Sequence, residues 1–273
     1  MAIYATEAPR LAAAACRQAL ADADVAPERV THLITVSCTG FVAPGVDCRL
    51  IESLGLSTGV ERTHIGFMGC HGALNGLRLA NAFVGSAEKT VVLLIAVELC
   101  SLHYDYAGEA GQLVANAIFA DGAGALVAGA REGAWRLGRS GSCLIPDSRG
   151  AMTWTVGDHG FVMTLSKQTP AWVKRHLRPW LEGWLAGAGL GLDDIRSWAI
   201  HPGGPRILEA AREALGLRSE DTAVSEAVFV ENGNMSSPTL LFVLHALRRR
   251  NAPRPCVALG FGPGLTIEAA LFF

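Results

Sequence analysis

The sequence is short of charged residues and carries no surplus of either sign. Only 18% of its 273 residues are charged, and 23 basic residues face 25 acidic ones, so the formal net charge is −2. Soluble domains average roughly 25% charged residues. A nucleic-acid-binding surface needs a concentration of basic side chains, so we expect no nucleic-acid partner. Because half of the residues are apolar, the composition also excludes a chain that is disordered over most of its length.

Long hydrophobic runs and paired cysteines are also absent. The apolar run at residues 90–97 is among the longest, far short of the roughly 20 residues of a membrane-spanning helix. The N-terminus has no basic flank before an apolar segment, as a secretory signal has. The seven cysteines are scattered, and none forms a Cys-x-x-Cys pair. This pattern argues against a disulfide framework or a metal site and favours a cytoplasmic protein, in which one cysteine can still be a nucleophile.

Apolar patterning predicts alternating helices and strands along the whole chain. Continuous apolar runs are typical of strands that are buried on both faces, as in parallel sheets covered by helices. We therefore expect an α/β protein. The predicted helices lie at residues 8–23, 71–83 and 171–188, with further helices that end near residues 54, 215 and 249; the predicted strands lie at residues 32–36, 90–97, 121–129, 193–200 and 255–259, with a last strand to residue 273.

The two halves of the chain pass through similar features in the same order. Corresponding features are separated by 161–165 residues; Leu54 and Leu215 each end a helix before a glycine, and Cys70 and Asn234 each precede a helix. Such an internal repeat predicts a tandem duplication of one α/β unit. We expect a first half at residues 1–130 and a second half at residues 131–273.

The halves differ at their starts. Before its first long helix the second half carries residues 135–169, which include strand-like segments at 152–156 and 161–165, whereas the first half begins directly at its helix. Two explanations are open: the first unit lacks its opening strands, or the chain is a shortened form of something longer.

Cys70 is the first candidate for chemistry. It follows Gly-Phe-Met-Gly and directly precedes a predicted helix. The N–H groups and positive dipole end of a helix N-terminus favour a thiolate. The alternative is an inert buried cysteine, since free cysteine is often a small hydrophobic residue of the core.

His201 and Asn234 are the other two candidates. His201 ends a predicted buried strand before Pro-Gly-Gly-Pro, and ligands bind at the carboxyl ends of strands in open α/β sheets. Asn234 lies just before a predicted helix. Taken alone, His201 could be a structural turn residue and Asn234 a helix cap. In a duplicated sheet the ends that carry Cys70, His201 and Asn234 can converge, and cysteine with distant histidine and asparagine is a pattern of thiol nucleophilic catalysis.

These residues lie in motifs that resemble the type III polyketide synthases, the chalcone-synthase-like family of the thiolase superfamily. The resemblance runs in order along the chain, and the set of motifs is specific where a single one is not. Bacterial members are the closer likeness. The motifs are Gly-Phe-Met-Gly-Cys70-His-Gly-Ala, Phe119-Ala-Asp-Gly-Ala, Ile200-His201-Pro-Gly-Gly-Pro, Gly233-Asn234-Met-Ser-Ser and Gly260-Phe-Gly-Pro-Gly-Leu-Thr-Ile-Glu268.

The resemblance implies a thiolase-like duplicated αβαβα layered fold with an incomplete N-terminal half, and a homodimer. It also implies a reaction: Cys70 takes the acyl group of a starter acyl-CoA, and His201 and Asn234 stabilise the enolate that malonyl-CoA leaves on decarboxylation. The pairing of His201 with Cys70 is expected to lower the thiol pKa. Condensation and cyclisation would give a pyrone or a phenolic product, with coenzyme A thioesters as substrates and no separate cofactor.

The resemblance further implies a set of substrate-binding residues. Phe119 and Phe261 are expected as apolar walls, with core packing as the alternative for both. Met163 stands where a second gatekeeper phenylalanine is found in the family, which fits a long aliphatic starter because methionine adapts to irregular pockets. Cys38 either lines the cavity or is an inert core thiol. The full predicted set is Cys38, Phe119, Met163, Ser236, Phe261 and Pro263.

Two other functions remain open. An initiating ketoacyl synthase of fatty-acid synthesis shares the cysteine, histidine and asparagine and the fold, but usually lacks the two Gly-Pro motifs that follow His201 and Phe261. A non-catalytic remnant that only dimerises or binds acyl chains would also fit a shortened first half. The sequence does not determine the starter, the number of extensions or the mode of cyclisation.

Overall fold

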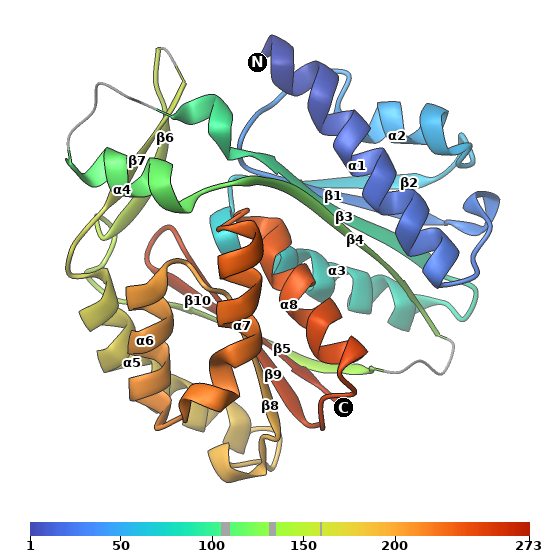
Figure 1. The fold of residues 1–273 in the computed structure, drawn as a ribbon. Coiled ribbons are helices and arrows are strands. Elements are labelled where there is room, and N and C mark those ends of the chain that lie inside the picture. Colours follow the sequence, from blue (N-terminus) through green and yellow to red (C-terminus); the bar gives the residue numbers. More distant parts are fainter. Residues whose placement is uncertain (105–109, 131–134, 159) are drawn as a thin grey trace.

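Two four-stranded sheets form the framework of the protein (Figure 1). The computed structural model describes residues 1–104, 110–130, 135–158 and 160–273. The first sheet has the order β2-β1-β3-β4, with β1 (His32–Ser37), β2 (Glu61–Gly66), β3 (Val91–Leu99) and β4 (Asp121–Gly129). The second has the order β5-β10-β9-β8, with β5 (Leu137–Leu144), β8 (Ser197–Ile200), β9 (Cys256–Gly262) and β10 (Thr266–Phe272). The hairpin of β6 (Met152–Val156) and β7 (Phe161–Leu165) stands apart from both.

The same three-strand arrangement occurs in each sheet. β1 runs parallel to β3, which pairs antiparallel with β4. In the same way, β8 runs parallel to β9, which pairs antiparallel with β10. The sheets differ only in the fourth strand, because β2 flanks β1 whereas β5 flanks β10. The internal repeat predicted from the sequence is therefore present in the topology.

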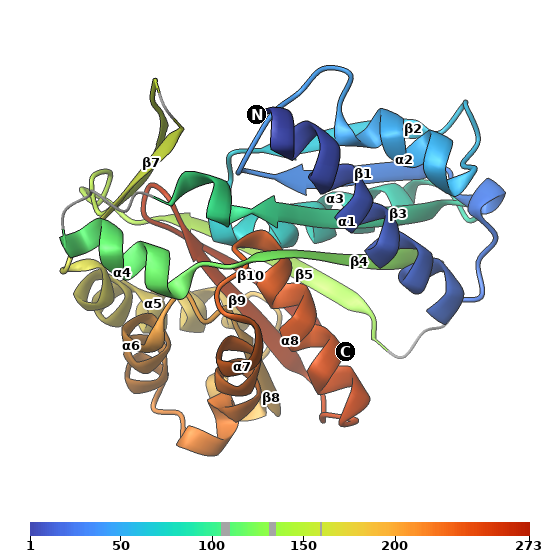
Figure 2. The ribbon, with the colours of Figure 1, turned by 45° about the horizontal axis from the view of Figure 1, so that its top comes forward.

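Helices form three layers around the two sheets (Figure 2). The outer face of the first sheet carries α1 (Ala2–Asp22) and α2 (Val46–Leu54), and the outer face of the second carries α5 (Thr169–Ala186) and α6 (Pro205–Leu215). Between the sheets lie α3 (Gly72–Ser86) and α8 (Ser237–Arg249), whose apolar residues pack against both. Two further helices are α4 (Ala110–Ile118) and α7 (Ser219–Asn232). This α-β-α-β-α layering confirms the predicted fold class.

β3 shows why a strand that is buried on both faces has a continuous apolar sequence. Its side chains alternate between the two faces of the sheet: residues 92, 94 and 96 pack in the central layer, and residues 93, 95 and 97 pack against the outer helices. Both faces are buried, so both sets are apolar, and the two-residue period of a half-exposed strand is lost.

The predicted strands at residues 121–129, 152–156 and 161–165 coincide with β4, β6 and β7. The strand predicted at 193–200 is wrong at its start, because a 3₁₀ turn at Leu192–Asp194 precedes the strand, and the Asp194 carboxylate accepts a hydrogen bond from the backbone N–H of Gly191 (2.7 Å). The sequence predicts no helix at α7, because α7 buries only one apolar side chain, Val228, and so lacks a helical apolar stripe.

The surroundings of Gly141 show how closely α5 packs on the second sheet. A Cβ placed on Gly141 of β5 would lie 2.3 Å from the indole nitrogen of Trp184 in α5, whereas nothing lies within 4 Å of a Cβ placed on Gly183 of the same helix. We expect Gly141→Ala to destabilise the protein by about 1–3 kcal/mol through overpacking. Gly183→Ala should be neutral or stabilising by up to about 1 kcal/mol through helix propensity. Urea unfolding checks both, and equal midpoints for the two variants would contradict the packing argument.

Candidate active site

Cys70 lies in a tight turn between β2 and the start of α3. The turn, Gly69–His71, is one turn of 3₁₀ helix, and the thiol of Cys70 is buried. Gly69 has a positive φ of 70°, and a Cβ there would lie 2.6 Å from the Cδ of Pro263. Only glycine meets both conditions without strain. The Gly-Cys sequence therefore positions the nucleophile candidate at a helix start beside the loop that contains Pro263.

Asn234 reaches the same place from the second half. Its backbone forms a bridge with the segment around Phe119: the Asn234 N–H donates to Ile118 O (2.8 Å), and the Ala120 N–H donates to Asn234 O (2.9 Å). The Ser236 N–H donates to Asn234 Oδ1 (2.8 Å), which fixes the amide orientation. The Nδ2 group then lies 4.0 Å from Cys70 Sγ.

His201 is fully buried at the carboxyl end of β8. Its backbone N–H donates to Leu259 O (2.8 Å), while neither ring nitrogen has a hydrogen-bond partner among the described residues. The ring borders Gly203, since a Cβ there would lie 3.6 Å from His201 Cδ2, and Gly203 O in turn accepts a hydrogen bond from Asn234 Nδ2 (3.4 Å). The imidazole is thus next to the amide that faces Cys70.

Burial sets the protonation of this group. Desolvation lowers the pKa of His201 to about 3, helped by the nearby His71, so the imidazole is neutral at physiological pH. Desolvation also raises the pKa of Cys70 to about 11, against the lowering effect of hydrogen bonds with Ser236 and Asn234. The expected depression of the thiol pKa is therefore wrong for this state: loss of water outweighs the helix start, and no hydrogen bond joins the thiol to His201.

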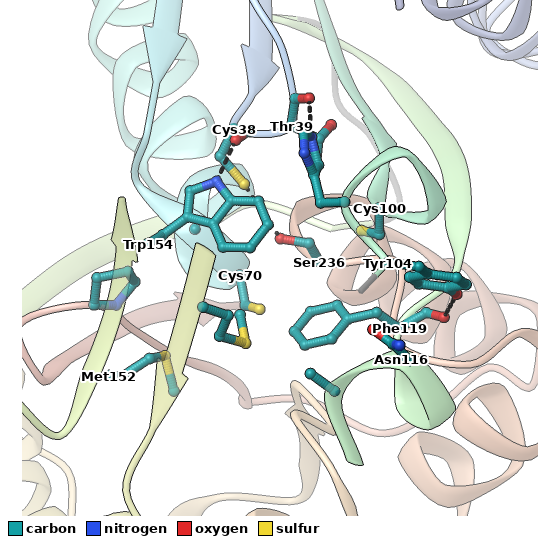
Figure 3. Close-up of a pocket in the computed structure, with 15 residues that line it drawn as sticks. Cys38, Thr39, Cys70, Cys100, Tyr104, Asn116, Phe119, Met152, Trp154 and Ser236 are labelled. Carbon is teal, nitrogen blue, oxygen red and sulfur yellow. Dashed lines mark hydrogen bonds between the residues drawn. The ribbon is translucent and has the colours of Figure 1, made fainter. Parts of the chain in front are cut away.

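A pocket of about 530 Å³, its mouth included, opens in front of Cys70 (Figure 3). Its lining is almost entirely apolar carbon and sulfur, so it suits an aliphatic or aromatic acyl group rather than a charged ligand. Within it the structure brings together the following residues that the sequence singled out: Cys38, Cys70, Phe119, Met163, Ser236 and Pro263.

Phe261 does not line this pocket. Its side chain is 2% exposed and packs in the core between β9 and the outer helices α5 and α6. The reason is the alternation along β9, where Gly260 and Gly262 face His71, in the turn before α3, and the residue between them faces the other way. Core packing, the alternative stated for Phe261, is what the structure has.

Glu98 is a buried acidic residue that sequence reasoning did not single out. Its carboxylate accepts hydrogen bonds from the Cys38 N–H (2.9 Å), from the N–H and hydroxyl of Thr39 (3.1 and 2.7 Å) and from the Ser237 hydroxyl (2.5 Å). Burial raises the pKa of Glu98, and these hydrogen bonds oppose the rise. The carboxylate thereby fastens the end of β1 to the start of α8, the two segments on either side of Cys70.

His103 and Trp154 also line the pocket and were missed. Trp154 lies on β6 opposite Met163 of β7, and both side chains face the pocket. The two-residue period of the predicted strand could have found this tryptophan, because Met152 and Trp154 alternate with polar residues. No local pattern could have found His103, which ends the 3₁₀ turn Cys100–His103 after β3.

Two absences hold for the part of the chain that the structure describes. There, no group of three histidine, cysteine or acidic side chains could hold a metal ion. No helix of that part is long and apolar enough to cross a membrane.

The pKa of Cys70 can be tested by alkylation of the free protein. Because the pKa is about 11, the rate at which iodoacetamide modifies Cys70 should still rise above about pH 10, where an ordinary thiol of pKa near 8.5 has reached its plateau. Peptide mass spectrometry separates Cys70 from the other cysteines, and an unfolded sample serves as the control. A plateau by about pH 8 would show that the thiol is activated in the free protein, against the effect of burial.

Known proteins match the chain along its whole length. Models of the chalcone and stilbene synthases match residues 1–132 (N-terminal domain) and 137–273 (C-terminal domain). The alpha-pyrone synthesis polyketide synthase-like protein Pks18 of Mycobacterium tuberculosis is 34% identical over all of this chain and 72% of its own length. The 1,3,6,8-tetrahydroxynaphthalene synthase of Streptomyces peucetius is 36% identical over 99% of this chain and 74% of its own length.

Solved structures agree with the sequence matches. PKS-I of the brown alga Ectocarpus siliculosus superposes with a TM-score of 0.93 at 36% identity, covering 97% of this chain and 74% of that one. The type III polyketide synthase domain of Steely1 from Dictyostelium also gives 0.93, at 28% identity, with 98% and 77% covered. The chain spans about three quarters of the length of these relatives. With both halves matched and the thiolase-like layers in place, the chain belongs to the chalcone and stilbene synthase family, the type III polyketide synthases.

Proposed function

We propose that the protein extends an acyl-CoA starter with malonyl-CoA units by decarboxylative condensation, through an acyl thioester on Cys70. The observation that carries this proposal is that Asn234 Nδ2 lies 4.0 Å from the sulfur of Cys70, which lines an apolar pocket. Neither Asn234 nor His201 lines the pocket itself; both lie behind Cys70, beside Gly203. A thiol nucleophile, an amide donor 4.0 Å from its sulfur and a buried neutral imidazole are the groups this chemistry needs.

Loading transfers the starter to the enzyme. Cys70 Sγ attacks the thioester carbonyl, a new carbon–sulfur bond forms, and the bond to the coenzyme A sulfur breaks. The thiol proton passes to His201 and then to the departing coenzyme A thiolate. Because neither ring nitrogen of His201 is committed to a hydrogen bond in the described structure, one can accept this proton while the other keeps its own.

Extension uses the same residues as hydrogen-bond donors. The malonyl carboxylate leaves as CO₂, and its electron pair forms an enolate whose oxygen accepts hydrogen bonds from Asn234 Nδ2 and the His201 ring N–H. The enolate carbon attacks the acyl thioester, the bond to Cys70 breaks, and the thiolate takes up one proton. Preorganised donors in a water-poor site stabilise such an oxyanion strongly.

The pocket determines which chains fit. Its apolar lining, with the flexible Met163 on one wall, supports an aliphatic starter. Release by intramolecular condensation would give a pyrone or a phenolic ring, the two product classes that the names of Pks18 and the tetrahydroxynaphthalene synthase state for those proteins.

The roles of Asn234 and Cys70 can be separated by assaying decarboxylation alone. Asn234→Ala removes one oxyanion donor and should slow CO₂ release from carboxyl-labelled malonyl-CoA by about 10²–10³-fold. Cys70→Ala is the matched control: it should abolish condensation and retain decarboxylation, since the sulfur is not needed for enolate formation. Decarboxylation by Asn234→Ala at the wild-type rate would contradict the role of Asn234 as a hydrogen-bond donor to the enolate oxygen.

An initiating ketoacyl synthase is the alternative enzyme for these residues. The two are distinguished by supplying malonyl-CoA and malonyl-acyl carrier protein separately, with the same acyl-CoA starter. Product from malonyl-CoA alone is expected. Turnover only with the carrier protein would favour the alternative, and no turnover with either would favour a non-catalytic remnant.

We also propose that the protein is a homodimer. β2 is an edge strand of the first sheet, and the exposed apolar side chains Phe41, Phe67 and Met68 lie on the loops that follow β1 and β2. Exposed apolar residues next to an open strand edge favour association.

The dimer proposal is tested by sedimentation velocity. Phe41 is 58% exposed and Val230, on α7, is 82% exposed. Phe41→Asp should shift the protein towards monomer because it places a charge in the interface, whereas Val230→Asp should leave the dimer intact. A monomeric wild type, or the same behaviour of both variants, would contradict this interface.

A further inference from the structure

The β6–β7 hairpin forms one wall of the pocket without belonging to either sheet (Figure 1). Trp154 of β6 donates its indole N–H to the carbonyl of Cys38 (2.6 Å), at the end of β1. Trp154 and Phe161 of the hairpin also contact the ring of His103, edge-on and stacked respectively, at centroid distances of 5.3 and 4.5 Å. The wall is therefore held to the first half by the Trp154 hydrogen bond, by the ring of His103 and by Phe67, whose ring lies 5.8 Å from that of Phe161.

His103 makes a hydrogen bond on each side of its ring. Nε2 lies 2.6 Å from Thr39 O, in the segment after β1, and Nδ1 lies 3.1 Å from the backbone N of Phe161, at the start of β7. We call His103 with these two backbone partners the His103 clamp. It joins the first half to the hairpin, and its ring lines the pocket between them.

The partners fix the tautomer of the ring. A carbonyl oxygen can only accept, so Nε2 carries a hydrogen and donates to Thr39. A backbone N–H can only donate, so Nδ1 has no hydrogen and accepts from Phe161. Both bonds exist together only in the neutral Nε2–H form, because protonation of Nδ1 would set two N–H groups against each other.

We propose that His103 is a positioning residue that holds the β6–β7 hairpin in place while its ring is neutral, and that protonation at Nδ1 releases this wall of the pocket. The proposal deepens the proposed function, on which it rests for the acyl chain that the wall would contact. Releasing the wall would widen the pocket and weaken discrimination between starters of different length.

The charges around the ring set the direction of the effect. Desolvation lowers the pKa of His103, the hydrogen bond to Thr39 O opposes this, the α-amino group of Met1 lowers the pKa further, and Asp121 raises it; the net direction is down. β6, β7 and α4 carry no titratable side chain, and Asp158 lies in the turn between β6 and β7. The pocket thiols Cys38 and Cys100 have a pKa well above the usual value through burial. The clamp is thus closed at neutral pH and opens as the pH falls below the ordinary imidazole range.

Hydrogen exchange of the Phe161 amide reports on the clamp directly, without any assay of activity. His103→Gln keeps an acceptor and a donor on one side chain but cannot be protonated, whereas His103→Ala keeps neither. His64→Gln is the matched control: His64 also has a lowered pKa and a ring hydrogen bond, to Thr35 (2.8 Å), but lies on β2.

In the wild type, protection of the Phe161 amide, corrected for intrinsic exchange, should fall about fivefold between about pH 7.5 and about pH 4.5, as one hydrogen bond is lost. His64→Gln should behave in the same way. His103→Gln should hold its protection across the range, and His103→Ala should lack it throughout. Constant protection in the wild type, or a fall in His103→Gln equal to that of the wild type, would overturn the proposal.

A second measurement connects the clamp to the pocket. The ratio of kcat/KM for palmitoyl-CoA and hexanoyl-CoA should change with pH in the wild type and stay constant in His103→Gln. A pH-independent ratio in the wild type would overturn the assigned effect on the pocket. If neither variant nor wild type turns over acyl-CoA, the proposed function fails, while amide exchange still decides whether the clamp exists.

Discussion

The buried carboxylate of Glu98 is the interaction on which the site depends. It accepts hydrogen bonds from Cys38 and Thr39 at the end of β1 and from Ser237 at the start of α8. These segments come from different halves of the chain, and Cys70 lies between them. A buried carboxylate is costly unless its acceptor positions are satisfied, so the two halves must meet in one register for the charge to be accommodated. The same register brings Asn234 to within 4.0 Å of the Cys70 sulfur.

Exclusion of water decides the chemistry of the site. It raises the pKa of the Cys70 thiol and lowers that of His201, so the free protein holds a neutral thiol and a neutral imidazole rather than an ion pair. A neutral thiol is a weaker nucleophile than a thiolate, so in the proposed reaction the pair would become charged only as bonds to substrate form. The same dry environment strengthens the hydrogen bonds that an enolate would receive from Asn234. Low reactivity at rest and strong stabilisation of the developing charge therefore share one cause.

The layers of the fold follow from the sequence, and all the predicted substrate-binding residues except Phe261 line the pocket. Apolar runs located the strands that are buried on both faces, because all residues of such a strand must be apolar, and the repeat located the second half. The half-exposed strands β2 and β5 have no such run and were not predicted. The sequence-based predictions were wrong or missing where the placement of a residue depends on distant parts of the chain. α7 shows no apolar stripe, Phe261 turns into the core because it alternates with two glycines, and His103 reaches the pocket only because a turn after β3 and a hairpin from the other half enclose it.

By itself, then, the sequence determined the α/β class and the internal duplication and singled out the candidate residues for chemistry, since periodicity and motif spacing are properties of the chain. Only the tertiary structure decided their protonation, their partners and the wall that faces them. Those properties depend on how much water the packed halves exclude and on which backbone groups remain unpaired at their boundary. Desolvation and hydrogen-bond satisfaction act through space, between residues such as His103 and Phe161 or Glu98 and Ser237, and no stretch of sequence encodes them locally.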